Sequence, residues 1–180
     1  AYVLLDAAGT IQGGEVLSAD FAQLTATAEI DGIEVTADQH VLAVAGTDIV
    51  NGSFTSVFET VDLEAWTGSI IGSVVMVKDQ GATGAQFAEL DAAEDVTGAV
   101  VDATGYIEIG LNETTDLDVP GLPNGQDVQI VMPAPVGVAE DLSVDNIVGV
   151  TAHTRENAET DVAYVLLDAA GTIQGGEVLS

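Results

Sequence analysis

The chain has no cysteine and almost no positive charge. Its 180 residues include 30 aspartates and glutamates but only two basic residues, Lys78 and Arg155, so the formal net charge at pH 7 is −28. Without cysteine, disulfide bonds and thiol redox chemistry are excluded. A surface this negative repels polyanions, which excludes nucleic acid and anionic membrane surfaces as partners.

Long apolar runs, aromatic residues and catalytic motifs are also scarce. No run approaches the roughly 18 residues that a membrane-spanning helix needs, and there is no signal-peptide pattern. Aromatic residues make up 4% of the chain and offer no evident platform for sugar rings. The only histidines, His40 and His153, lie far apart, and no G-x-S-x-G, H-E-x-x-H or P-loop pattern occurs. We therefore expect no enzymatic activity, although so many acids leave accidental carboxylate pairs for glycoside chemistry open.

What remains is a composition typical of β-structure. Hydrophobic residues form 47% of the chain, the mean hydropathy is +0.36, and valine, alanine, threonine and glycine are abundant. Apolar and polar residues alternate over Gln23–Asp31, Gly105–Gly110 and Asp127–Met132, as in half-buried strands. Asp31-Gly32 is followed by another alternating stretch, which predicts a tight hairpin.

These patterns predict an all-β fold. Many short strands between dense turn signals favour an antiparallel β-sandwich or jelly-roll-like module. One segment differs: within Ala85–Asp95, Phe87 and Leu90 would share one face of a helix. This segment is predicted to be a short helix or a surface excursion, so we expect at most one short helix.

An internal repeat defines the domain organisation. The eighteen residues AYVLLDAAGTIQGGEVLS at positions 1–18 recur without change at 163–180, an offset of 163 − 1 = 162 residues. Identity over that length is not accidental. We interpret residues 1–162 as one β-sandwich module, with a possible inner boundary near 81–84. Residues 163–180 would then be the first strands of the next identical module.

The duplication could also arise in two ways that do not involve tandem modules. An engineered copy of the N-terminal strand could complete the subunit's own sheet, or successive subunits of a polymer could have been joined into one sequence. The residues before the second copy, 154–162, do not resemble a Gly/Ser linker, which favours native tandem repetition.

The repeated segment is the main candidate site. Tyr2, Val3, Leu4 and Leu5 form an apolar strand, repeated as Tyr164, Val165, Leu166 and Leu167. An exposed apolar edge strand is an aggregation hazard unless a partner pairs with it. We expect residues 162–167 to join one module to the next by adding a strand to the neighbour's sheet, so the partner would be another copy of this sequence.

The other candidates are acidic or polar loops. Asp116 and Asp118 precede a turn, and Asp127 follows it, so their oxygens could hold a calcium ion, which takes six to eight oxygen ligands. The same residues also fit a solvated acidic loop, and we expect no other cofactor. Asn51 and Asn112 begin N-x-S/T sequons, which are weak indicators of secretion and glycosylation. Lys78 is expected to be a strand-end charge that extends into solvent.

The repeat, the acidity, the β-pattern and the missing cysteine together resemble the giant tandem-repeat adhesins and surface fibres of bacteria and archaea. The scarcity of lysine is similar to halophilic proteins, whose self-repulsion is screened in roughly molar salt. This resemblance implies an extracellular, cell-surface protein with a structural or adhesive role. The alternative is a pilus-like or sheath subunit that polymerises non-covalently by donor-strand exchange. A third possibility is a secreted polysaccharide-acting enzyme or binding module.

Overall fold

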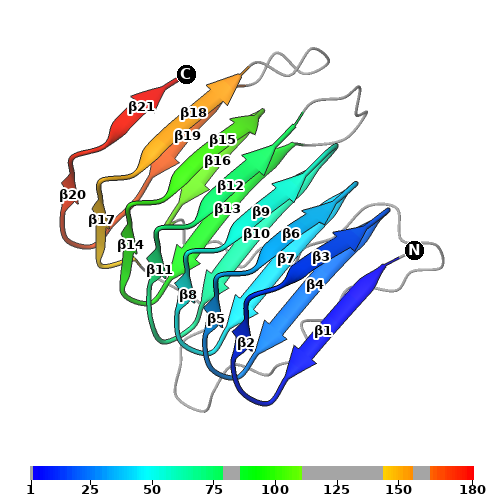
Figure 1. Ribbon diagram of the computed structural model, residues 1–180. Coiled ribbons are helices and arrows are strands. Elements are labelled where there is room, and N and C mark those ends of the chain that lie inside the picture. Colours follow the sequence, from blue (N-terminus) through cyan, green and yellow to red (C-terminus); the bar gives the residue numbers. More distant parts are fainter. Residues whose placement is uncertain (1, 79–85, 111–143, 156–162) are drawn as a thin grey trace, which may run out of the picture.

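The chain forms a stack of three-stranded coils. A computed structural model describes residues 2–78, 86–110, 144–155 and 163–180. In these ranges the chain folds only into strands, turns and irregular segments, and successive coils lie parallel to one another (Figure 1). Three parallel sheets therefore run along one axis, which is the architecture of a parallel β-helix, or β-solenoid. The N- and C-terminal coils lie at opposite ends of the stack (Figure 1).

Each sheet contains seven strands, one from every coil. Sheet A consists of β1 (Val3–Ala7), β4 (Phe21–Ala26), β7 (His40–Ala45), β10 (Thr60–Ala65), β13 (Phe87–Ala92), β16 (Tyr106–Ile109) and β19 (Tyr164–Leu167). Sheet B consists of β2 (Ile11–Gln12), β5 (Ile30–Asp31), β8 (Ile49–Val50), β11 (Ile70–Ile71), β14 (Asp95–Thr97), β17 (Asn146–Val148) and β20 (Ile173–Gln174). Sheet C consists of β3 (Glu15–Ser18), β6 (Glu34–Ala37), β9 (Ser53–Ser56), β12 (Val74–Val77), β15 (Val100–Thr104), β18 (Thr151–Arg155) and β21 (Glu177–Leu179). We number the coils 1 to 7, so that coil 1 is β1–β3 and coil 7 is β19–β21.

The core is a set of side-chain rows that run along the axis. In sheet A, Leu24, Ala43, Leu63 and Leu90 are in register on successive strands, and all are fully buried. In sheet B, one inward position holds isoleucine in six coils and valine in the other. Branched apolar side chains pack well in such rows because each strand presents alternate residues to the interior.

A left-handed residue turns the chain from sheet B into sheet C in every coil. Glycine occupies this corner in six coils, with φ between 61° and 69°, and Asn51 occupies it in coil 3, with φ 53°. Only glycine and, less readily, asparagine adopt this conformation without steric cost. The residues at this corner are Gly13, Gly32, Asn51, Gly72, Gly98, Gly149 and Gly175.

Replacing Gly98 with alanine tests the corner. A Cβ atom at Gly98 would meet no atom within 4 Å, so its φ of +62° is the only source of strain. We expect Gly98→Ala to lower the free energy of unfolding by about 1–2 kcal/mol. Gly9→Ala is the matched control, because Gly9 also has open space but lacks the left-handed φ. Equal melting temperatures for the two variants would contradict this account.

The prediction of an antiparallel sandwich or jelly roll is wrong. The fold is all-β, as expected, but the described strands form three parallel sheets. Asp31-Gly32 is not a hairpin, because β5 and β6 belong to different sheets and Gly32 is the corner between them. The segment for which the sequence predicts a short helix or a surface excursion contains a strand instead: β13 lies within it, with Leu90 in the core and Phe87 on the opposite face.

One local prediction of a strand is confirmed and a second is confirmed only in part. β16 lies within Gly105–Gly110, and Ile107 and Ile109 face the core. Residues 23–31 contribute to two strands, β4 and β5, rather than one, and β4 is buried on both faces rather than half-buried. The alternating stretch 127–132 and the possible domain boundary at 81–84 lie outside the described residues.

Candidate assembly ends and a buried carboxylate ladder

The repeated sequence forms the first and the last coil of the stack. β1, β2 and β3 are the edge strands of the three sheets at one end, and β19, β20 and β21 are the edge strands at the other. The residues predicted to mediate assembly therefore lie at the two edges of sheet A. Val3 and Leu5 are in register with core residues of β4, and Val165 and Leu167 with core residues of β16.

Several large apolar side chains of these two coils are exposed. Tyr2 is 65% exposed and Leu4 57%, and their copies Tyr164 and Leu166 are 40% and 42% exposed. Coil 7 also exposes side chains that belong to the core row: Ile173 is 51% exposed and Val178 48%. Uncovered strand edges with apolar side chains are sites for pairing with another strand.

The remaining predicted sites are less informative. Asp116, Asp118, Asp127 and Asn112 lie outside the described residues. Among the residues that are described, no group of three or more histidines or acids is arranged to hold a metal ion. Nor does the described part of the chain contain a helix that could cross a membrane. Asn51 is exposed at the corner between β8 and β9.

A cluster of carboxylates on sheet A was not predicted from the sequence. Asp62 is in register with Glu89, and Glu64 with Asp91, on the adjacent strands β10 and β13. Glu89 is in turn in register with Glu108 on β16. All five alternate with core residues and therefore lie on the outward face of the sheet. Asp62 and Glu89 are nevertheless only 4% and 5% exposed.

Burial raises the pKa values of three of these acids, Asp62, Glu64 and Asp91. Burial first, and then the charges of Glu64, Glu89 and Asp91, raise the pKa of Asp62 well above its usual range. Burial also raises the pKa of Glu64, although the indole nitrogen of Trp66, 2.8 Å from Glu64 Oε2, donates a hydrogen bond that opposes the shift. Burial, followed by the charge of Glu89, raises the pKa of Asp91 to about 8. Asp91 Oδ1 is buried without a hydrogen-bond partner. With a pKa of about 8, Asp91 therefore holds a neutral carboxyl group at pH 7.

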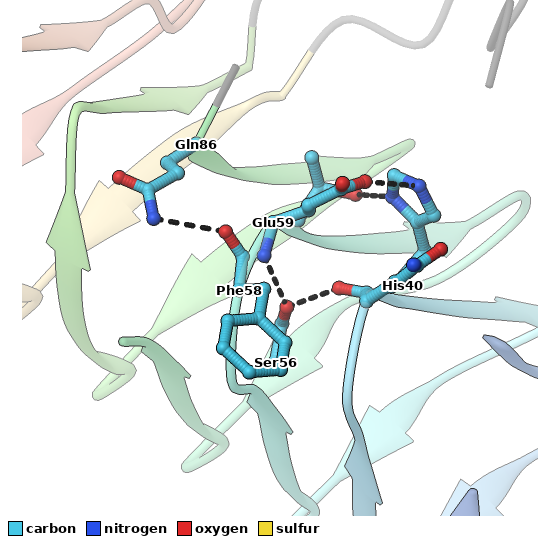
Figure 2. A network of polar contacts seen from close by, with 7 residues as sticks. His40, Ser56, Phe58, Glu59 and Gln86 are labelled. Carbon is cyan, nitrogen blue, oxygen red and sulfur yellow. Dashed lines mark hydrogen bonds and ion pairs between the residues drawn. The ribbon is translucent and has the colours of Figure 1, made fainter. Parts of the chain in front are cut away.

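A second polar cluster ties successive coils together near the start of sheet A (Figure 2). The Ser56 hydroxyl donates to the carbonyl of Gln39 and accepts the Glu59 N–H at 3.0 Å. The Gln86 side-chain amide donates to the Phe58 carbonyl at 2.8 Å. These bonds satisfy backbone groups where the chain leaves sheet C, so we assign this cluster a structural role.

His40 belongs to the same cluster. Its Nδ1 lies 2.8 Å from Thr60 Oγ1, and its Nε2 lies 2.6 Å from Glu59 Oε2 without a well-aligned hydrogen bond. Burial lowers the pKa of His40 to about 4, against an opposing effect of Asp20, so the ring is neutral at pH 7. The contact with Glu59 is therefore not an ion pair at that pH.

An aromatic row runs towards the C-terminal end of sheet A. Phe87 and Tyr106 stack with ring centroids 4.9 Å apart, and Tyr106 and Tyr164 with centroids 5.1 Å apart. The Tyr164 hydroxyl donates to Glu108 Oε1 at 2.7 Å. These contacts fix the repeated segment to the coil below it through side chains as well as through backbone hydrogen bonds.

No protein-family model, curated protein or solved structure matches this chain.

Proposed function

We propose that this protein is a structural or adhesive component of an extracellular filament or cell-surface fibre, built from tandem identical β-solenoid modules. The observation that carries the proposal is the repeated coil. The same sequence occupies both ends of the stack, 162 residues apart, and joins the same three sheets at each end. Solenoid repeats contact only their neighbours along the axis, so such a stack can be extended without a change in its design.

The surface charge supports a setting outside the cell, in a medium rich in salt. A net charge of −28 on 18.3 kDa disfavours a compact state at low ionic strength. At roughly molar salt the Debye length is about 3 Å, and most of this repulsion is screened. The same charge disfavours lateral association of fibres, because their sides carry like charges and repel each other. Strand pairing along the axis uses uncharged backbone groups and is affected less.

The mass of the native polypeptide under denaturing conditions tests the proposal. We expect purified native material to show a mass several times the 18.3 kDa of this chain, in steps of one 162-residue period. Denaturing gel electrophoresis with intact-mass spectrometry would measure it. A mass near one period would contradict a covalent array and favour the non-covalent, pilus-like subunit instead.

A second candidate function rests on the carboxylate cluster. Asp62–Glu89 and Glu64–Asp91 are carboxyl pairs on adjacent strands, and a group with a pKa near 8 can act as a general acid at neutral pH. A secreted polysaccharide-acting enzyme would use such a pair. The near-complete burial of Asp62 and Glu89 favours the filament, because a glycosidic bond would have to reach these groups. Hydrolysis of an acidic or neutral polysaccharide that is lost in Asp91→Asn would support the enzyme.

A further inference from the structure

The same coil sequence occurs twice, as coil 1 and as coil 7. In coil 1 the strands pair with a neighbour on one side, and in coil 7 they pair with a different neighbour on the opposite side. As coil 1, it pairs with coil 2 in all three sheets. As coil 7, it pairs with coil 6 in all three sheets. Because the two coils are identical in sequence, the two sets of contacts together describe both sides of a single coil.

The same residues face the core in both settings. Leu5 is in register with Leu24, and its copy Leu167 is in register with Ile109. The other core positions behave in the same way: Val3 pairs with Ala22 and Val165 with Ile107, Ile11 with Ile30 and Ile173 with Ile147, and Val16 with Val35 and Val178 with Ala152. A coil placed between coil 6 and coil 2 would thus continue every core row without a shift in register.

Within residues 1–180, coil 7 is paired on one side only, with coil 6. Val178 is 48% exposed, whereas its copy Val16, packed against coil 2, is 8% exposed. Ile173 belongs to the isoleucine row that is fully buried at Ile30 and Ile49, yet it is 51% exposed. The side chains with which coil 7 continues the core rows are therefore covered from one side only by residues 1–180.

We infer that coil 7 is followed along the axis by coil 2 of a second copy of this sequence, in the register in which coil 1 is followed by coil 2 here. The inference rests on the proposed function, since it takes the filament to grow along the solenoid axis. Seven coils, of which the last repeats the first, give 7 − 1 = 6 coils per period. Leu167 would then lie between Ile109 of its own copy and Leu24 of the next.

Coil 1 of a second copy fits against coil 7 less well than coil 2. Stacking coil 1 on coil 7 in register would place Asp6 beside Asp168, its identical copy, and like charges directly opposite each other are destabilising. In the coil 1–coil 2 contact, Asp6 is instead in register with Thr25. Coil 2 therefore avoids one like-charge pair in sheet A.

Cross-linking between two full-length variants tests the inference. Leu17 is in register with Thr36, so Leu179, the copy of Leu17, should lie beside Thr36 of the second copy. One variant carries Leu179→Cys. The other carries Thr36→Cys together with Leu5→Asp, which weakens coil 1 and frees the edge of coil 2. Since the natural chain has no cysteine, each variant contains a single thiol.

We expect a mixed disulfide when the two variants are mixed under oxidising conditions in molar salt. Neighbouring strands lie about 4.8 Å apart, within the Cα separation that a disulfide spans. In the control, Thr55→Cys replaces Thr36→Cys one coil further along. That thiol would be about 10 Å away, beyond disulfide reach, so we expect at least about tenfold less cross-link. Equal yields for Thr36→Cys and Thr55→Cys, or none for Thr36→Cys, would overturn the inference.

Three further experiments keep the result decisive. Circular dichroism checks that Leu5→Asp leaves the remaining coils folded. If it does not, the Thr36→Cys chain without Leu5→Asp is incubated at higher concentration, where spontaneous opening of coil 1 admits the second copy. Adding Leu167→Asp to the Leu179→Cys chain should abolish the cross-link. The cross-link and the mass of the native polypeptide together separate this inference from the proposed function. If the cross-link does not form but the native polypeptide contains many periods, this register is refuted and the filament proposal is not. If the cross-link forms but the native polypeptide contains a single period, only the covalent array is refuted.

Discussion

Replacing Asp91 with asparagine is expected to stabilise the protein at pH 8. In the folded state the pKa of Asp91 is about 8, against an ordinary value of 3.8. Between these values the unfolded chain loses the proton while the folded chain keeps it, so the free energy of unfolding falls as pH rises. The slope is up to about 1.4 kcal/mol per pH unit for one such group. Below pH 4 both states are protonated and the penalty is absent.

The fall in the free energy of unfolding caused by Asp91 is clearest between pH 6.5 and 8, because His40 opposes it at lower pH. Its pKa falls from 6.5 to about 4 on folding, so its contribution makes stability rise with pH between those values and opposes the carboxylates. Above pH 6.5 this opposition ends. The raised pKa values of Asp62 and Glu64 act in the same direction as that of Asp91.

Denaturant unfolding of the wild type and of Asp91→Asn at pH 6.5 and pH 8 measures the difference. We expect the wild type to lose about 2 kcal/mol more than the variant over this interval, at about 1.4 kcal/mol per pH unit. Asparagine preserves the shape of the side chain and offers an N–H donor to the neighbouring acids. Glu34→Gln, which removes the same charge at an exposed position of β6, is the matched control. Parallel pH profiles for all three proteins would show that the cluster is not protonated.

The local elements of this fold were easier to predict than its topology. Alternation of apolar and polar residues locates β16 and most of β4, because the inward residues of a strand recur with period two whichever way its neighbour runs. The alternation pattern cannot distinguish a β-hairpin from the corner at which a solenoid coil passes from one sheet to the next, since both need a glycine after a short strand. At Asp31-Gly32 that ambiguity led to an antiparallel interpretation, and the parallel pairing of β5 with β8 overturns it.

A second period, much shorter than 162 residues, carries the signal of the solenoid. Ile11, Ile30 and Ile49 are 19 residues apart, and each is followed two residues later by the left-handed corner residue. Ile70 continues the row after 21 residues, and the later coils are separated by longer and unequal stretches. This period is weak in the sequence because even its isoleucine and glycine positions vary, with Val96 in coil 5 and Asn51 in coil 3, whereas the 18-residue copy is identical throughout.

The carboxylate cluster could not have been found without the topology. Asp62 and Glu89 are separated by 27 residues, a distance set by the length of the connection between β12 and β13. Nothing in the local sequence of either strand marks these acids as buried, because acids at alternate positions of a strand, as in Asp62-Leu63-Glu64 and Glu89-Leu90-Asp91, normally face solvent. Their apposition follows only from parallel in-register stacking.

Truncation of a core leucine is expected to have the largest effect, and the effect should depend on the coil. Leu63 in coil 4 is fully buried between Ala43 and Leu90, so Leu63→Ala should cost about 3 kcal/mol of unfolding free energy, within the range of buried leucine truncations. Leu167 occupies the equivalent inward row in coil 7 but is only partly buried. There the cost should be about 1 kcal/mol, because less apolar surface is lost from the core.

Urea unfolding of both variants at low protein concentration would give these values. Comparing Leu63→Ala with Leu167→Ala also tests whether successive modules of the filament share a core. If coil 2 of another copy covers coil 7, Leu167 becomes a central core residue, and the cost of Leu167→Ala should approach that of Leu63→Ala in a chain of two or more linked periods. An unchanged small cost in such a chain would mean that successive modules do not share a core. In that case the repeated coil would cap each module rather than join it to the next.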